Sequence, residues 1–107
     1  MGYNTRQAGA YTVVDWNGDV DLSRSPDARE QILQFLEDGH HVLVDLSAVY
    51  HIDTSGVAVL VEGHLTAAKK GLYFGLVAPS GAVMGVLQLA HMDEIFRVHV
   101  SIESIPP

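Results

Sequence analysis

The chain has no cysteine among its 107 residues, which excludes disulfide bridges and cysteine-ligated metal sites. No apolar run approaches the roughly 18 residues that a membrane-spanning helix needs, and the N-terminal segment lacks the basic start and apolar stretch of a signal peptide. We therefore expect a cytoplasmic protein that does not insert into a membrane. Basic residues are also scarce. Six Lys and Arg against thirteen Asp and Glu give a formal net charge of −7, which disfavours nucleic-acid binding.

The composition is that of a folded globular protein, with 48% hydrophobic and 18% charged residues. The length predicts one domain that spans residues 1–107. The acids are concentrated in the first half: residues 1–53 hold nine acids and three bases, whereas residues 54–107 hold four acids and three bases. Two interpretations stay open, a solvated surface that aids solubility and an acidic rim that a basic partner recognises.

Alternating strand and helix patterns predict an α/β fold. β-Branched, aromatic and apolar runs predict strands at 3–8, 11–16, 42–46, 49–52, 72–78 and 96–102. Helices are expected at 25–38, after Gly56, and from Ser80 to about Ala90, with Ser25 as the first cap and Asn17-Gly18 as a turn. This order implies right-handed crossovers, hence a mixed sheet of four or five strands with a parallel core and about three packed helices.

The helix after Gly56 has one predicted core-facing stripe. Its members recur at three- and four-residue steps, as Val57, Leu60, Val61, Leu65 and Ala68. Ala58 and Val59 would then face away from the core, next to Thr54. They are either ordinary exposed apolar residues or a docking patch with Glu62 at its rim.

The segment that carries chemistry lies just before this helix, where an acid, two hydroxyls and a glycine follow a buried strand as Asp53-Thr54-Ser55-Gly56. We expect Thr54 or Ser55 to cap the helix, at the end of the sheet where α/β proteins bind ligands. A phosphate on Thr54 would be held by unpaired backbone N–H groups. The alternative is an ordinary cap, with Gly56 present only for close packing.

Four segments, in this order, resemble the STAS domain family, whose founding members are bacterial anti-sigma-factor antagonists. They are Gly18-Asp19-Val20-Asp21, Val44-Asp45-Leu46-Ser47-Ala48-Val49, Ile52-Asp53-Thr54-Ser55-Gly56-Val57 and Ala78-Pro79-Ser80-Gly81-Ala82-Val83. The third is the most specific, because it resembles the family's Asp-Ser-Ser-Gly-Leu switch motif. Together with residues 87–96, which resemble the segment that closes the domain, the resemblance covers most of the chain.

The resemblance implies a binding module rather than an enzyme, with no cofactor and no metal. In that family the residue after the motif's Asp, here Thr54, is phosphorylated by a partner kinase, and phosphorylation abolishes binding to that anti-sigma kinase. Ser55 is the fallback acceptor. The implied partner-binding surface comprises Asp21, Asp53, Ser55, Gly56, Ala58, Val59, Glu62, Pro79 and Ser80.

The sequence departs from the family pattern at three places: Thr54 stands for the commoner Ser, Val57 for Leu, and the long C-terminal helix is missing or cut to a stub. STAS subunits of phospholipid-transport ABC systems often read Asp-Thr-Ala-Gly, which makes an ABC ATPase the alternative partner and Thr54 a direct contact. A stressosome-like scaffold is a further alternative. The enzyme class finds no support, because the sequence has no GxxxxGK[ST] loop, no His-Glu-x-x-His pair and no base paired with the hydroxyls.

Overall fold

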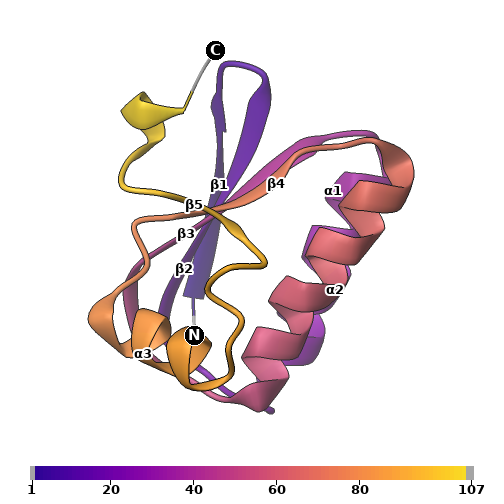
Figure 1. Ribbon diagram of the computed structural model, residues 1–107. Coiled ribbons are helices and arrows are strands. Elements are labelled where there is room, and N and C mark those ends of the chain that lie inside the picture. The colour runs from indigo at the N-terminus through magenta and orange to yellow at the C-terminus, as the bar shows by residue number, and fades with distance from the viewer. Residues whose placement is uncertain (1, 106–107) are drawn as a thin grey trace.

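The computed structural model describes residues 2–105, with side chains from residue 4 onward. A single five-stranded sheet has the order β1-β2-β3-β4-β5 (Figure 1). Its strands are β1 (Gly2–Ala8), β2 (Tyr11–Val20), β3 (His41–Ile52), β4 (Phe74–Val77) and β5 (Arg97–His99). β1 pairs antiparallel with β2, and every other neighbouring pair is parallel, which confirms the predicted mixed sheet with a parallel core.

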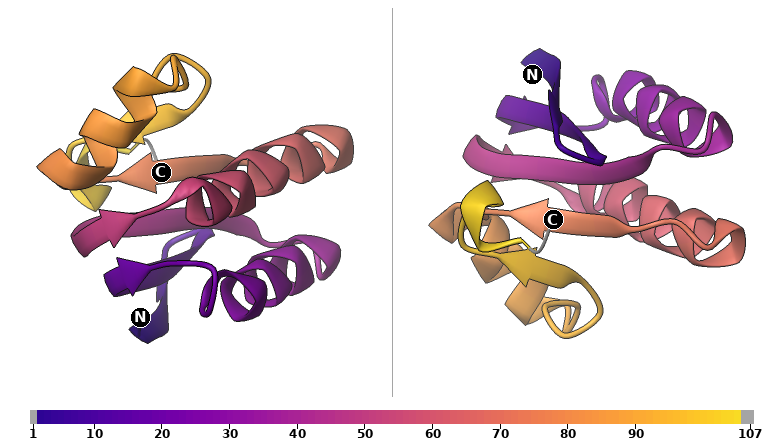
Figure 2. Two further views of the ribbon diagram at one scale, coloured as in Figure 1. Left: turned by 90° about the horizontal axis from the view of Figure 1, so that it is seen from below. Right: turned by 90° about the horizontal axis from the view of Figure 1, so that it is seen from above.

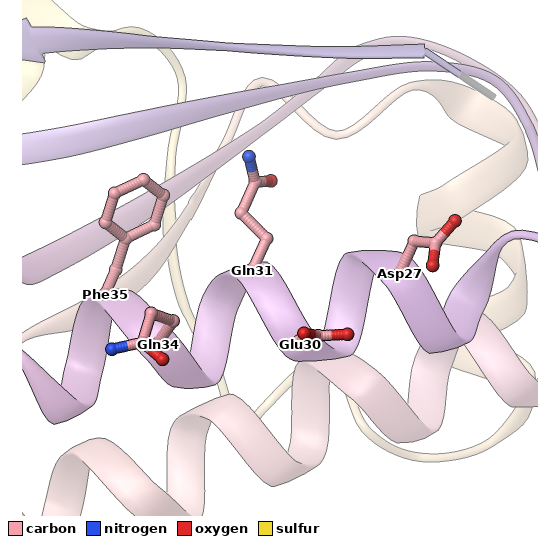
Figure 3. A pocket seen from close by; sticks show the side chains of 5 residues that line it. All are labelled: Asp27, Glu30, Gln31, Gln34 and Phe35. Carbon is pink, nitrogen blue, oxygen red and sulfur yellow. The ribbon is translucent and has the colours of Figure 1, made fainter.

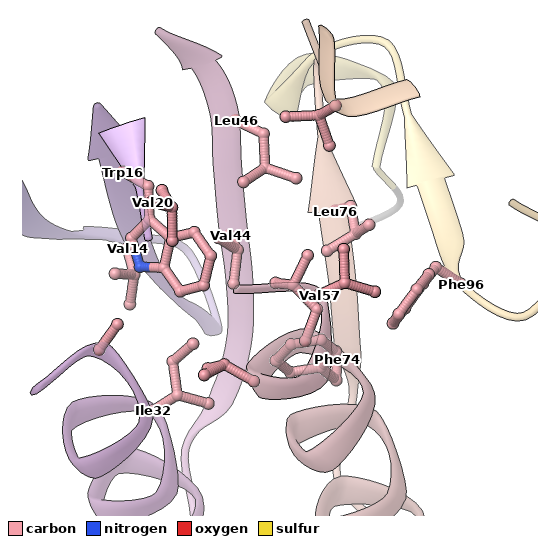
Figure 4. Packing of buried hydrophobic residues seen from close by; sticks show 14 of the residues in the cluster. Val14, Trp16, Val20, Ile32, Val44, Leu46, Val57, Phe74, Leu76 and Phe96 are labelled. Carbon is pink, nitrogen blue, oxygen red and sulfur yellow. The ribbon is translucent and has the colours of Figure 1, made fainter. Parts of the chain in front are cut away.

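All three helices pack on one face of this sheet. They are α1 (Ser25–Glu37), α2 (Thr54–Lys70) and α3 (Gly81–Leu89). α1 and α2 lie side by side. α3 lies apart from them, toward the edge of the sheet that β5 forms (Figures 1 and 2). Strand residues such as Val14, Val44 and Leu76 meet the helices in one continuous core (Figure 4). The alternation of side chains along the strands directs these residues to the helix face.

The opposite face of the sheet has no helix over it in the described part of the chain. A small second core of Val13, Leu43 and Val77 is covered there by Ile105, which follows a single 3-10 turn (η1, Ile102–Ser104). Within residues 100–105 this turn is the one helical element that follows β5.

Two local predictions about turns and caps are wrong. Asn17-Gly18 does not end a strand, because β2 continues to Val20. Gly18 has a φ of 73° and lies between two shifts of register of β2 against β3. Such an irregularity is a β-bulge, which also tolerates the turn-forming residues found there. Ser25 does not cap α1 either: the cap position is Arg24, without a side-chain hydrogen bond, and Ser25 is already helical and buried.

Strand β3 is longer than predicted, because the segment 49–52 belongs to it rather than forming a separate piece. It therefore carries the chain without interruption to Asp53 and the start of α2. In the described residues, no helix is both long and apolar enough to cross a membrane.

Candidate functional site

Asp53 caps helix α2, which corrects the prediction that Thr54 or Ser55 occupies the cap. Its Oδ1 accepts hydrogen bonds from the backbone N–H of Ser55 at 2.9 Å and of Gly56 at 3.1 Å. The hydroxyl of Ser55 donates to the same oxygen. The Ser55 hydroxyl, followed by the N–H groups of Gly56, Ser55 and Leu22, lowers the pKa of Asp53 below its ordinary value of 3.8. The Asp53 carboxylate is thus held ionised and in a fixed position.

Thr54 is the first residue of α2, and its side chain is exposed. Among the residues that the structure describes, no side chain or backbone group forms a hydrogen bond with its hydroxyl, whereas the neighbouring Ser55 hydroxyl is engaged by Asp53. Of the two candidate acceptors, Thr54 therefore has the accessible hydroxyl.

Gly56 lets the start of α2 approach the sheet closely. A Cβ atom at this position would lie 2.7 Å from Cγ1 of Ile52 and 2.9 Å from Cγ1 of Val20. Both side chains are buried at the ends of adjacent parallel strands. The close approach predicted for Gly56 is therefore present, and it places the Asp53–Thr54 loop against the carboxyl end of the sheet.

Asp21 lies beside Asp53, in the loop that joins β2 to α1. Its Oδ1 accepts hydrogen bonds from the hydroxyl of Ser23 at 2.6 Å and from the Ser23 N–H at 3.0 Å, and the first of these is the main reason that the pKa of Asp21 is lowered. The negative charge of Asp53 acts on Asp21 in the opposite direction, so the two carboxylates repel each other. The structure thus brings together two of the predicted acids next to Thr54.

The predicted patch on α2 is only half correct. Ala58 is exposed, as expected, but Val59 is 5% exposed and belongs to the main core, so the prediction that Val59 faces away from the core is wrong. Glu62 accepts two hydrogen bonds of 2.6 Å from the guanidinium of Arg29 on α1, and this ion pair lowers the pKa of Glu62.

Pro79 and Ser80 precede α3 and are partly buried. Ser80 caps α3, because its hydroxyl oxygen accepts from the N–H of Val83 at 3.3 Å, and this confirms the predicted cap. The same hydroxyl donates to the carbonyl oxygen of Val49 at 2.7 Å. Ser80 therefore joins α3 to β3, and its role in partner binding stays a prediction.

Sequence reasoning missed an apolar groove of about 400 Å³ between α2 and the end of α3. Thr54 lies at one end of it. The other lining residues are Val57, Ala58, Val61, Glu62, Leu65, Val86, Ala90 and Met92. Val61 and Leu65 are apolar, but their three- and four-residue spacing from Val57 and Leu60 predicts that both lie in the core. Leu65 is in fact 54% exposed.

A second groove, of about 380 Å³, runs along α1, and four of its five lining residues are polar or charged (Figure 3). It is lined by Asp27, Glu30, Gln31, Gln34 and Phe35. None of these residues belongs to the predicted site. Across the described residues, no group of three or more His, Asp or Glu side chains is placed to hold a metal ion.

Comparisons with known proteins agree with this fold. The model of the family described as the STAS domain matches residues 3–105. A candidate anti-sigma factor antagonist from Thermotoga maritima is 22% identical, with 94% of this chain and 88% of that one covered and a TM-score of 0.88. The antagonist SpoIIAA in its unphosphorylated form is 16% identical, covering 96% and 92%, with a TM-score of 0.81. The phosphorylated form of Bacillus SpoIIAA is 15% identical, covering 96% of each chain, with a TM-score of 0.76.

Proposed function

Because the chain belongs to the STAS domain family, we propose that it is an anti-sigma-factor antagonist switched by phosphorylation at Thr54. In its unphosphorylated form it binds an anti-sigma serine/threonine kinase. The kinase transfers the γ-phosphoryl group of ATP to Oγ1 of Thr54, ADP and a proton leave, and binding is lost. The observation that carries this proposal is the exposed Thr54 hydroxyl, free of hydrogen bonds within the described residues, beside a Ser55 hydroxyl that Asp53 engages.

The effect of the phosphate follows from the charges around it. A phosphate adds about −1.5 to −2 charges and three acceptor oxygens. The first-turn N–H groups of Ser55 and Gly56, which would otherwise hold it, already donate to Asp53. With Asp21 and Asp53 nearby, the added charge is poorly compensated, so a partner surface fitted to a neutral hydroxyl meets repulsion and an unfavourable desolvation.

The test uses four baits in the native lysate: wild type, Thr54→Ala, Thr54→Glu and Ser55→Ala. Wild type and Thr54→Ala should retain one kinase, identified by mass spectrometry, and Thr54→Glu should lose it; Ser55→Ala tests the fallback acceptor. With the purified kinase, Thr54→Glu should weaken binding by about tenfold or more, which corresponds to about 1.4 kcal/mol. With ATP, wild type and Ser55→Ala should be phosphorylated and Thr54→Ala should not.

Two results would contradict the proposal. Full phosphorylation of Thr54→Ala would assign the acceptor to another residue, and unchanged kinase binding by Thr54→Glu would remove the electrostatic switch. Recovery of an ABC ATPase that Thr54→Ala binds more weakly would instead assign the chain to lipid transport, with Thr54 as a contact residue.

A further inference from the structure

Helix α2 has two apolar stripes, and only one of them is fully buried in the core. The core face consists of Gly56, Val57, Val59, Leu60, Gly63 and Ala67. A second stripe of Ala58, Val61 and Leu65 recurs at three- and four-residue steps and borders the groove between α2 and α3. Val61 is partly buried and forms part of the floor, while Leu65 stays 54% exposed.

The length of the groove along α2 matches that of a short bound helix. From Thr54 to Leu65 the wall formed by α2 covers eleven helical steps, about 16 Å at 1.5 Å per residue. Val86, Ala90 and Met92 form the facing wall. A bound amphipathic helix anchors side chains at i, i+3 or i+4, and i+7, which span about 10 Å. Such anchors match the spacing of the stripe.

The charges around the groove favour a positively charged occupant. Its lining includes one charged residue, Glu62, and no Lys or Arg. Arg29 on α1 is paired with Glu62, so this pair adds little net charge to the groove. Asp53 and Asp21 lie at the Thr54 end, and the whole chain has a net charge of −7. A second copy of this chain would bring like charges to the same place, whereas a basic segment would be complementary.

We infer that the groove between α2 and α3 binds an amphipathic helix of the partner protein, with apolar anchors over Ala58, Val61 and Leu65 and Lys or Arg residues toward Asp53 and Asp21. This inference rests on the proposed function, because it assigns the partner element that docks beside Thr54. It is compatible with a phosphate switch. A phosphate on Thr54 would stand at the end of the groove where apolar side chains pack, so the bound helix could cover it only at the cost of desolvating it.

The probe is a Leu/Lys amphipathic peptide of about 14 residues, roughly four helical turns. Two matched peptides accompany it, one with Glu in place of Lys and one with the Leu/Lys composition scrambled. Binding is followed through amide chemical shifts of the isotope-labelled full-length chain. The Leu/Lys peptide should shift Ala58, Val61, Leu65 and Val86, and the two matched peptides should bind at least about tenfold more weakly, which is about 1.4 kcal/mol.

A pair of variants locates the binding without changing the net charge. Leu65→Gln replaces an apolar anchor by a polar helix former and should lower the affinity of the Leu/Lys peptide by about fivefold. Val100→Gln is the control, since Val100 is 85% exposed and does not line the groove. It should leave the affinity unchanged.

Several results would overturn the inference: no binding, equal binding of the Glu peptide, shifts confined to the polar groove on α1, or an unchanged affinity for Leu65→Gln. Concentration-dependent shifts of the same groove residues in the free protein would identify a second copy as the occupant and would also overturn it. The proposed switch is judged separately by the kinase. A kinase that distinguishes Thr54→Glu from wild type but binds Leu65→Gln normally would refute the groove and leave the switch standing.

Discussion

Helices α1 and α2 lie side by side on one face of the sheet, yet each borders a groove of different chemistry. The groove on α1 has a volume of about 380 Å³ and is lined by two acids, two glutamines and one phenylalanine. The groove between α2 and α3 has a volume of about 400 Å³ and is lined mainly by aliphatic side chains. Since the volumes are nearly equal, composition distinguishes them. Water solvates the polar groove well, whereas the apolar groove gains free energy when a partner covers it.

The two helices also begin differently. α1 starts after Arg24 without a side-chain cap, whereas Asp53 accepts two backbone N–H groups at the start of α2. α1 contains no glycine, whereas α2 places Gly56 and Gly63 against buried side chains of the sheet and of α1. The special local features are therefore concentrated on the helix that carries Thr54. The following predictions test whether these features, rather than generic helix stability, set α2 apart.

The largest effect is expected for Gly56→Ala. The added methyl group would lie 2.7 Å from a buried carbon of Ile52, so the start of α2 must move. Overpacking of this kind costs about 1–3 kcal/mol. The matched control is Gly85→Ala within α3, where a Cβ meets nothing within 4 Å and should stabilise the helix by about 0.5–1 kcal/mol. Urea unfolding measures both. An unchanged stability for Gly56→Ala would show that the close approach is not needed.

A smaller loss is expected for Asp53→Ala, which removes the cap from α2. Loss of an N-cap side chain lowers the free energy of unfolding by about 1 kcal/mol. Asp27→Ala is the control in α1, because Asp27 lies in the first turn without serving as the cap. Its favourable interaction with the helix dipole is about 0.3 kcal/mol. Urea unfolding again gives both values, and equal losses would mean that α2 gains nothing special from its cap.

The sequence predicted the architecture well because its patterns are strong there. Buried parallel strands such as the run 42–46 are almost continuously apolar. The alternation 96–102 indicates an edge strand, and β5 is at the edge of the sheet but is shorter than predicted, covering Arg97–His99. The choice of cap was harder. Asp, Thr and Ser are all good N-cap residues, so spacing alone could not select Asp53 over Thr54 or Ser55.

The face of α2 was predicted wrongly for a different physical reason. The helix is apolar almost all around, so its periodicity does not fix which side faces the sheet. The glycines determine which side faces the sheet. A Cβ at Gly63 would lie 2.7 Å from the ring of Phe74, so only a glycine fits there. With Gly63 facing Phe74, Val59 is buried and Leu65 is exposed. An apolar groove between two helices depends on that rotation, and for this reason the sequence did not reveal it.

The smallest effect concerns pH and the charge of the α2 cap. Hydrogen bonds lower the pKa of Asp53 below its ordinary value of 3.8, so the folded state favours the carboxylate. A group of this kind stabilises the fold above the unfolded pKa, and the stabilisation is lost as the pH falls through the lower folded pKa. Asp53→Asn keeps a capping oxygen but cannot titrate. Wild type should therefore be more stable than Asp53→Asn near neutral pH, and the difference should shrink as the pH falls below 3.8 and through the lower folded pKa. Urea midpoints across this range measure it, and a difference that stays constant with pH would show that the charge of Asp53 does not stabilise α2.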